Sequence, residues 1–449
     1  MTKVITRFPP SPTGYFHIGS ARTALFNYLF ALQNKGVMHL RFEDTDKERS
    51  KKEFEEDIIE GLQWLGISYA AETHRQSERA TVYQAHVKAL IDKGFAYEAE
   101  ASTADANKKV VRFKNPNTTI RFADLVRGEV SFDTTELKDF IVAKSVDEPL
   151  YHLAVVIDDA ETGVTHVIRG EDHISNTPRQ ILILEALGFE RPQYAHIPLI
   201  LAPDRSKLSK RHGAVSVNEY RRLGFLPQAL INYLALLGWN PGDERELFSM
   251  QELAAVFGIA RIQKGGAIFD MEKLRWFNRE HLLRLSEKEF SAAALPILEG
   301  ALKERGVPWN AAMGERLVPV LRERISVWSD IDEAVTEGEF DYLFKAPGVK
   351  AAQIPFKDTS PAATVEHLKE VRKRIAALPS STCVDPALIK AALWEYADKE
   401  GRGAVLWPLR FSLTGKEKSP DPFSVISILA QDEALARIDS AIELLKDHG

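Results

Sequence analysis

Residues 3–66 alternate between short apolar strands and helical segments, and this alternation limits the chain to a small group of folds. KVITRF at 3–8 predicts a strand, and apolar residues at helical spacing then predict a helix with Ser20 as its N-cap. A second strand at 37–44 and a charged helix from about Lys51 follow. Because strands joined through a helix lie parallel with a right-handed crossover, the sequence predicts a parallel sheet. Such open sheets bind ligands at the carboxyl ends of their strands.

The alternation is interrupted between 83 and 149, where short strands and turns predict an inserted α+β module. Beyond it we predict strands for YHLAVVIDD, VTHVIRG and HIPLILAP, with a helix over SNTPRQILILEALG. A Rossmann-type α/β fold split by an insertion fits this order. After FLPQALINYLALLGW nearly every segment has a helical pattern, and we place a boundary near residue 310. The expected parts are the first half of the sheet domain at 1–82, the insertion at 83–149, the second half at 150–235, a helical region at 236–310 and an all-α domain at 311–449.

Composition narrows the class of protein. With 449 residues, 45% hydrophobic and 27% charged, the chain has ordinary values for a multidomain globular protein. No apolar run approaches the ~20 residues that span a bilayer, and the N-terminus does not resemble a signal peptide, so we expect a cytoplasmic protein without a membrane partner. The single cysteine, Cys383, excludes an internal disulfide or a cysteine cluster for zinc. A net charge of -6 argues against nonspecific coating of nucleic acid.

The common nucleotide and zinc signatures are missing. The sequence contains no GxxxxGK[ST] and no HExxH, and its one GxG, at 401–403, lacks the third glycine of a dinucleotide fingerprint. If the chain binds nucleotides, it does so through another kind of motif.

The loop before the first helix is a candidate nucleotide-binding motif. Prolines at 9, 10 and 12 give the loop a fixed shape, and His17 and Gly19 stand where the helix begins. A helix N-terminus offers unpaired amides to phosphate, and Gly19 allows a close approach. Lys207 and Lys210 on a distant loop have the charge to stabilise a carboxylate's attack on the α-phosphate of ATP. That attack needs no general base, because the carboxylate is already ionised.

These segments carry a resemblance to a known family. PPSPTGYFHIGS, VIRGEDH and KLSKRHGAVSV resemble glutamyl-tRNA synthetases of the bacterial type, class I enzymes whose signatures are written HIGH and KMSKS. The resemblance covers residues 3 to about 280 and resumes at 401–415. It implies ATP, with Mg²⁺, as the energy source, and L-glutamate and tRNA(Glu) as partners of an enzyme that we expect to be a monomer.

The resemblance also assigns a glutamate site. It places the γ-carboxylate against Arg7 and Arg169 and the α-amino group against Glu43, and a bidentate arginine fork matches a carboxylate better than an amide. Two alternatives stay open: Arg169 pairs structurally with Glu171 or Asp172, or the acidic group Glu43, Asp44 and Asp46 serves glycoside hydrolysis or magnesium binding. The glutamate-binding residues that it implies are Arg7, Pro9, Ser11, Glu43, Tyr151 and Arg169.

The ATP site follows from the same resemblance. His17, Lys207 and Lys210 are the implied catalytic residues, and Leu208 stands where other members have methionine. The implied ATP-binding residues are Pro10, Ser11, His17, Gly19, Ser20, His173, Lys207, Leu208, Ser209 and Lys210.

For tRNA, the resemblance implies that the insertion holds the acceptor end, that 236–310 contacts the stem and that the helical remainder binds the anticodon. Arg372, Arg402 and Arg410 are the candidate contacts, although Arg372 fits an exposed helix face equally well. Trp407 and Pro408 fit a core better than base stacking. Some relatives carry zinc through cysteines in the insertion. This chain has Ala99 and Ala101 there, so we predict no zinc and no other metal site.

Other functions compete with glutamyl-tRNA(Glu) formation. The close alternative is a non-discriminating or tRNA(Gln)-specific enzyme that feeds an amidation pathway. A shorter relative that glutamylates a tRNA base lacks a helical C-terminal domain, which residues 311–449 oppose. A non-catalytic RNA-binding paralogue is opposed by the intact His17, Lys207 and Lys210, and a bare nucleotidyltransferase by the length of the chain.

Overall fold

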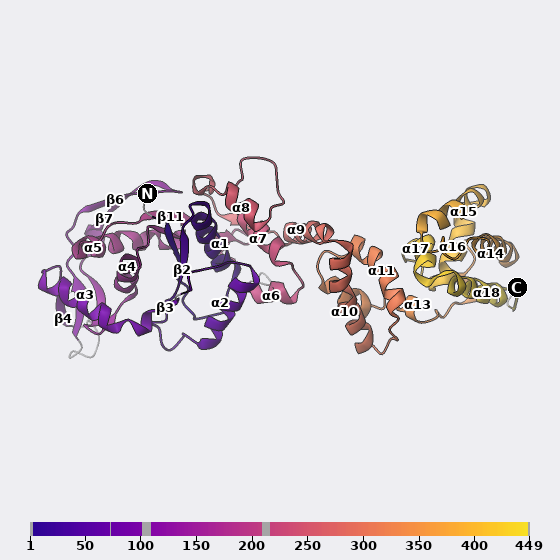
Figure 1. Cartoon of the computed structure of the whole chain (residues 1–449), viewed down its shortest axis with the longest axis horizontal. Coiled ribbons are helices and arrows are strands. Elements are labelled where there is room, and N and C mark those ends of the chain that lie inside the picture. Colours follow the sequence, from indigo (N-terminus) through magenta and orange to yellow (C-terminus); the bar gives the residue numbers. More distant parts are fainter. Residues whose placement is uncertain (1–2, 72, 101–108, 209–215, 448–449) are drawn as a thin grey trace. The chain divides into compact units, whose positions relative to one another are not determined.

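The computed structural model describes residues 3–71, 73–100, 109–208 and 216–447. They form two compact units, 1–278 and 279–449 (Figure 1). Residue 310, where we expected the boundary, lies inside the second unit, in the turn between two helices that pack on one another: α10 (Glu287–Glu304) and α11 (Ala311–Arg324). The finer division into five parts stays a prediction. No helix in the described part of the chain is both long and apolar enough to cross a bilayer.

The first unit begins with the predicted parallel sheet. Its three strands pair in the order β1-β2-β3, with Arg7 opposite His39 in the register. The helix after the first strand buries Ala21, Leu25 and Leu29 among its apolar residues. The strand–helix–strand–helix prediction is therefore confirmed. The elements are β1 (Ile5–Phe8), α1 (Ile18–Gln33), β2 (Val37–Phe42), α2 (Lys52–Trp64) and β3 (Thr73–Arg75).

The segment from Tyr151 to Glu161 forms helix α4, so the strand that we predicted for YHLAVVIDD is wrong. Residues 153–159 are all buried, and a continuously buried apolar run carries no periodicity that separates a helix from a strand. The strand predicted from VTHVIRG is present as β10 (His166–Gly170). The strand predicted from HIPLILAP is divided into the end of β11 (Gln193–Ile197) and β12 (Ile200–Leu201), with Pro198 between them.

The inserted segment contributes strands to the sheet of its host. Strands β6 (Thr119–Asp124) and β7 (Gly128–Asp133) extend the β10–β11 pair, in the order β10-β11-β6-β7. Beside β1, Thr165 donates a backbone hydrogen bond of 2.9 Å to Ile5, which brings β10 next to the first sheet. The rest of the insertion forms its own antiparallel sheet. That part comprises α3 (Ala80–Asp92), β4 (Ala96–Glu100), β5 (Lys109–Phe113), β8 (Phe140–Ser145) and β9 (Glu148–Pro149).

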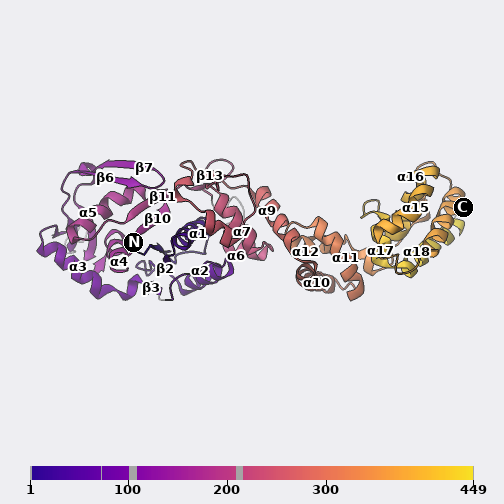
Figure 2. The same cartoon turned by 45° about the horizontal axis from the view of Figure 1, so that its top comes forward.

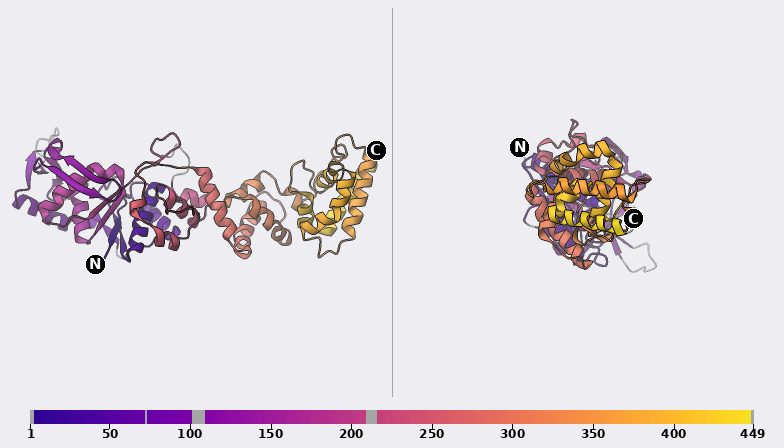
Figure 3. Two further views of the ribbon diagram at one scale, coloured as in Figure 1. Left: turned by 90° about the horizontal axis from the view of Figure 1, so that it is seen from above. Right: turned by 90° about the vertical axis from the view of Figure 1, so that its right-hand side faces the viewer.

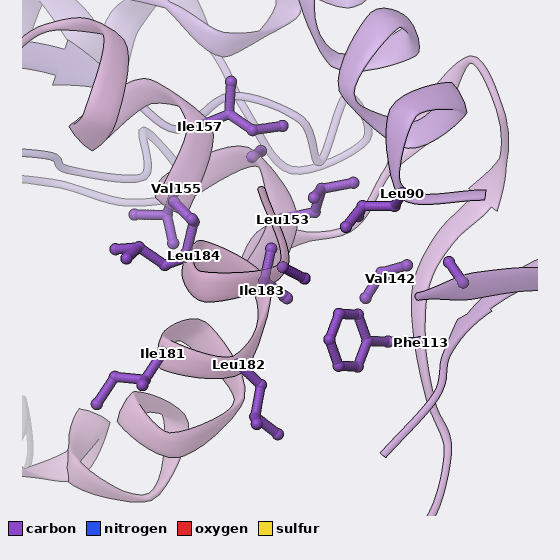
Figure 4. Close-up of a cluster of buried hydrophobic side chains, with 14 of the residues drawn as sticks. Leu90, Phe113, Val142, Leu153, Val155, Ile157, Ile181, Leu182, Ile183 and Leu184 are labelled. Atoms are coloured by element: carbon purple, nitrogen blue, oxygen red, sulfur yellow. The ribbon is translucent and has the colours of Figure 1, made fainter. Parts of the chain in front are cut away.

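One hydrophobic core joins the insertion to its host (Figure 4). Leu90 and Phe113 of the insertion pack in the same cluster as Leu153 and Ile157 of α4 and Leu184 of α5 (Thr177–Leu187). Each fully buried side chain of this size contributes about 1.5–3 kcal/mol, so the insertion and host stabilise one another.

The first unit closes with short helices that cover α1. Helix α1 packs against α7 (Pro227–Leu236), its neighbour in Figure 2, and against α8 (Met250–Val256). Strand β12 pairs with β13 (Ala267–Ile268), and the remaining helices are α6 (Val217–Arg222) and α9 (Met271–Arg284), which runs past the end of the unit.

Every regular element of the second unit, over its described residues, is helical, as the sequence predicts. Helices α14, α16 and α18 pack on one another. Figure 3 shows the C-terminal part of the chain, in yellow, as a group of helices. Besides α10 and α11, the helices are α12 (Ser329–Thr336), α13 (Asp341–Phe344), α14 (Pro361–Ala376), α15 (Pro386–Glu400), α16 (Arg402–Thr414), α17 (Pro422–Leu429) and α18 (Gln431–Asp447).

Candidate active site

A cavity of about 1600 Å³ opens at the carboxyl ends of β1, β2 and β10. This is the edge where an open parallel sheet binds its ligands. The predicted glutamate- and ATP-binding residues that the structure describes all line it; they are Arg7, Pro9, Pro10, Ser11, His17, Gly19, Ser20, Glu43, Tyr151, Arg169, His173, Lys207 and Leu208. Ser209 and Lys210 lie outside the described residues. The structure thus brings the predicted residues together, while their individual roles stay predictions.

The two motif segments are tied to one another although about 200 residues separate them. Ser216 forms a β-bridge with His17, and Val217 donates a backbone hydrogen bond of 2.8 Å to Phe16. Asp57 of α2 accepts hydrogen bonds from Phe16 N and from Asn218 Nδ2, each at 2.6 Å. The loop before α1, helix α2 and helix α6 therefore share one buried carboxylate.

His17 is the N-cap of α1, so the N-cap that we predicted at Ser20 is wrong. His17 Nδ1 accepts a hydrogen bond from Ser20 N at 3.2 Å, which places Ser20 inside the first turn. A Cβ on Gly19 would approach the imidazole to 3.1 Å, so glycine leaves room for this ring. Burial lowers the pKa of His17, as does Lys207, against the opposing effect of Asp172. The ring is therefore neutral at pH 7.

Arg7 is held by a buried carboxylate that the sequence did not point to. Its Nε lies 3.2 Å from both carboxylate oxygens of Asp159, and Arg41 Nη1 donates to the same group at 2.6 Å. Burial would raise the pKa of Asp159, but Arg7 and Arg41 outweigh it and hold that pKa below its usual value. The charge of Arg7 is therefore compensated within the protein.

Glu43 shares this network. Its Oε1 accepts a hydrogen bond of 3.2 Å from Arg41, and its backbone is fixed by bonds with Pro10 and Ser11. Burial raises the pKa of Glu43, against the effect of Arg41 and Arg7. A ligand ammonium group would lower that pKa again and hold the carboxylate ionised. Asp44 accepts a hydrogen bond from Ser77 N, and Asp46 accepts one from Arg49 Nε, so both acids have partners within the protein.

Arg169 is the contrasting cation. It is 5% exposed, and over the described residues no carboxylate lies within ion-pair distance of it. Glu171 pairs with Arg127, and Asp172 lies 3.5 Å from Lys207, so neither forms the ion pair with Arg169 that the sequence left open. Burial lowers the pKa of Arg169 without a carboxylate contact to restore it. The cavity thus holds a buried guanidinium whose charge lacks a direct partner.

Tyr151 and His173 lie beside this guanidinium. Tyr151 Oη is 3.3 Å from His173 Nδ1, and Asn176 Nδ2 is 3.2 Å from the same nitrogen. Burial, followed by Arg169, lowers the pKa of His173 to about 4, so this ring is also neutral.

The candidate tRNA contacts lie in the second unit. Arg372 pairs with Asp439, Nη2 to Oδ2 at 2.8 Å, and Arg402 pairs with Asp398 at 2.6 Å while lying over the ring of Trp394. Arg410 lies in α16, and its Nε is buried. Trp407 packs against Phe356 and Phe411, in keeping with the core interpretation. The RNA-binding role of the three arginines stays a prediction.

Metal ligands do not gather in the described part of the chain. Within it, no group of three or more His, Cys, Asp or Glu side chains is disposed to hold an ion. Residues 101–108, part of the segment on which the zinc prediction rests, lie outside the described residues, so the absence of zinc stays a prediction.

Comparison with known proteins gives the class. Residues 3–107 and 98–276 match the family described as tRNA synthetases class I (E and Q), catalytic domain, and residues 289–442 match an anticodon binding domain. The fold, the cavity at the strand ends and these matches define a class I aminoacyl-tRNA synthetase.

Individual relatives identify the branch. A glutamate–tRNA ligase of Carboxydothermus hydrogenoformans is 41% identical, over 97% of this chain and 99% of its own. A second, from Aquifex aeolicus, is 48% identical over 67% of this chain and 72% of its own. The crystal structure of a glutamate tRNA ligase from Elizabethkingia meningosepticum, in complex with its amino acid, matches with a TM-score of 0.86 at 32% identity, over 99% and 100% of the two chains. The chain belongs to the glutamyl-tRNA synthetase family.

Proposed function

We propose that this enzyme attaches L-glutamate to the 3′ end of tRNA(Glu) through a glutamyl-adenylate formed from ATP. The observation that carries the proposal is the buried guanidinium of Arg169, which has no ion-pair partner among the described residues, in the same cavity as His17 and Lys207. A side-chain carboxylate would supply the missing negative charge, whereas an amide would leave the cation unpaired in a buried site. The substrate class is therefore an amino acid with an acidic side chain.

In the first step the α-carboxylate oxygen of glutamate attacks the α-phosphorus of ATP. The bond between that phosphorus and the bridging oxygen breaks, and pyrophosphate leaves. Neutral His17 carries its proton on Nε2, since Nδ1 accepts from Ser20 N. Nε2 lies 3.0 Å from Ser20 Oγ, and when ATP binds its N–H donates to a phosphate oxygen in place of that hydroxyl. Lys207, 69% exposed at its side chain, supplies positive charge from the opposite segment. ATP arrives as its Mg²⁺ complex, which is the substrate form.

In the second step a terminal ribose hydroxyl of the tRNA attacks the acyl carbon of the adenylate. The ester forms, AMP leaves, and the hydroxyl proton passes to the phosphate oxygen of the leaving group. Glu43, at the end of β2, holds the α-ammonium group during both steps. The enzyme works in the cytoplasm as a monomer and supplies glutamyl-tRNA(Glu) to protein synthesis.

ATP–pyrophosphate exchange with glutamate or glutamine, each with and without tRNA, tests the proposal. We expect exchange with glutamate and almost none with glutamine, because glutamine leaves Arg169 unpaired. Charging of purified tRNA(Glu) and tRNA(Gln) in separate reactions then defines the tRNA. Equal exchange with both amino acids would refute the assigned substrate, and charging of tRNA(Gln) would favour the amidation pathway.

A further inference from the structure

Arg169 is held in place by a neutral histidine. Its Nε donates a hydrogen bond of 3.1 Å to His196 Nε2, and its Nη2 donates one of 2.8 Å to the hydroxyl of Thr177. Both partners are 0% exposed. His196 is not among the described residues that line the cavity, so it lies behind the guanidinium and leaves the opposite edge for a ligand.

A second carboxylate fixes the tautomer of this histidine. Asp124 Oδ2 lies 2.6 Å from His196 Nδ1, and it also accepts from the backbone N–H of His196 at 3.1 Å. Asp124 is ionised, because His196 and backbone N–H groups lower its pKa against the effect of burial. Burial lowers the pKa of His196 against the effect of Asp124, so the ring is neutral and its proton is on Nδ1. The lone pair on Nε2 faces Arg169 Nε and the hydroxyl of Thr177, whose oxygen lies 3.1 Å away.

Asp124 itself is rigidly placed, and it comes from the insertion. It ends β6, beside β11, and its Oδ1 accepts from the backbone N–H groups of Val126 at 3.0 Å and Arg127 at 2.8 Å. A carboxylate with this many fixed donors has little freedom to turn. The orientation of His196, and with it that of Arg169, is thus set from outside the parallel strands that carry the motifs.

Two of the arginines that line the cavity, Arg7 and Arg169, are supported in chemically different ways. Arg7 donates to the carboxylate of Asp159, whereas Arg169 donates to an imidazole and a hydroxyl. A carboxylate in place of His196 would hold Arg169 equally firmly but would neutralise it. An uncharged acceptor orients the guanidinium and leaves its charge available to a ligand.

We propose that Asp124 and His196 are positioning residues that aim Arg169 at the side-chain carboxylate and, by using an uncharged acceptor, set the preference for a carboxylate over an amide. This inference rests on the proposed function. It adds two specificity-determining residues that neither motif contains.

Steady-state kinetics of the full-length enzyme with its tRNA tests it. His196→Leu removes the acceptor, and we expect KM for glutamate to rise at least about tenfold, as loss of a hydrogen bond to a charged group predicts. The ratio of kcat/KM for glutamate to that for glutamine should fall by a similar factor, while KM for ATP changes by less than about twofold. His196→Gln places an amide oxygen near the position of Nε2 and should restore KM for glutamate to within about threefold of wild type.

Two further variants keep the test decisive. Thr177→Val removes the second acceptor at nearly constant shape and should raise KM for glutamate, even if His196→Leu does not fold. His86→Leu, a histidine of α3 that contacts Glu161 outside the cavity, is the matched control and should leave every constant unchanged. Wild-type enzyme that does not use glutamate would refute the proposed function. If the wild type is active but His196→Leu leaves KM for glutamate and the selectivity unchanged, only this inference is refuted. Where His196→Leu is unfolded, the same result with Thr177→Val refutes it.

Discussion

His17 combines two roles that substitution can separate. As N-cap it accepts a hydrogen bond from Ser20 N, and as a cavity residue it faces the proposed phosphate position. His17→Ala should lose about 0.5–2 kcal/mol of the free energy of unfolding, the usual cost of a lost cap. It should also lose at least ~10² in the rate of adenylate formation. Asparagine is among the best N-caps, so His17→Asn should keep the stability and still lose the rate.

Urea unfolding and pyrophosphate exchange measure the two effects on the same samples. If His17→Asn keeps near wild-type exchange, the histidine is only a cap and its catalytic role is wrong.

The motif residues were predictable one by one, but their supporting residues were not. Arg7 and Arg169 stand in recognisable sequence blocks. Asp159 and His196, which hold them, stand in apolar runs and meet their partners only in the folded chain. A sequence pattern reports local spacing, whereas Asp159 lies 152 positions from Arg7, so geometry alone decides that contact.

Helix α2 acts on the site through Asp57, which bonds both the loop before α1 and helix α6. Asp57→Ala leaves Phe16 N and Asn218 Nδ2 without their acceptor and should cost about 1.5–3 kcal/mol of unfolding free energy for each such charge-assisted bond. KM for ATP should rise, because both motif segments lose their common anchor. Asn218→Ala removes one bond only. The two substitutions should be non-additive in urea unfolding, and strict additivity would contradict a shared anchor.

Helix α4 carries a histidine that makes stability depend on pH. Burial, followed by the charges of Arg179 and Arg169, lowers the pKa of His152 to about 4. Below the unfolded value of about 6.5, the unfolded chain binds a proton that the folded ring does not. The free energy of unfolding should therefore decrease as the pH is lowered from about 6.5 to about 4. The decrease is at most about 1.4 kcal/mol per pH unit for one histidine.

His152→Gln removes this titration at similar size. Between pH 7 and pH 5 its urea midpoint should fall less than that of the wild type, and an unchanged pH dependence would contradict the lowered pKa. The same helix shows why element type was harder to predict than element position. Complete burial erased the periodicity of residues 153–159, whereas α14 and α18 bury one face only and their helical pattern stayed visible.

The division into two compact units predicts separable unfolding of the whole molecule. Calorimetry should show two transitions. MgATP should raise the temperature of only the transition that belongs to residues 1–278. At a hundredfold excess over Kd, the unfolding free energy of that unit should increase by about 2.7 kcal/mol. Leu409→Ala, in the buried face of α16, should lower the temperature of only the second unit's transition. The unfolding free energy of that unit should decrease by about 2–5 kcal/mol. One transition that both changes move together would show that the units unfold as a single body.

The β6–β7 hairpin, which the insertion contributes to the sheet of its host, has a consequence for engineering this enzyme. Strands β6 and β7 belong to the same sheet as β10 and β11, and Asp124 at the end of β6 contacts His196, the residue that holds Arg169. The insertion cannot be exchanged as an independent module, because its removal would break the β11–β6 pairing and remove the contact between Asp124 and His196. Any exchange of this insertion with that of another synthetase would therefore have to include β11 as well.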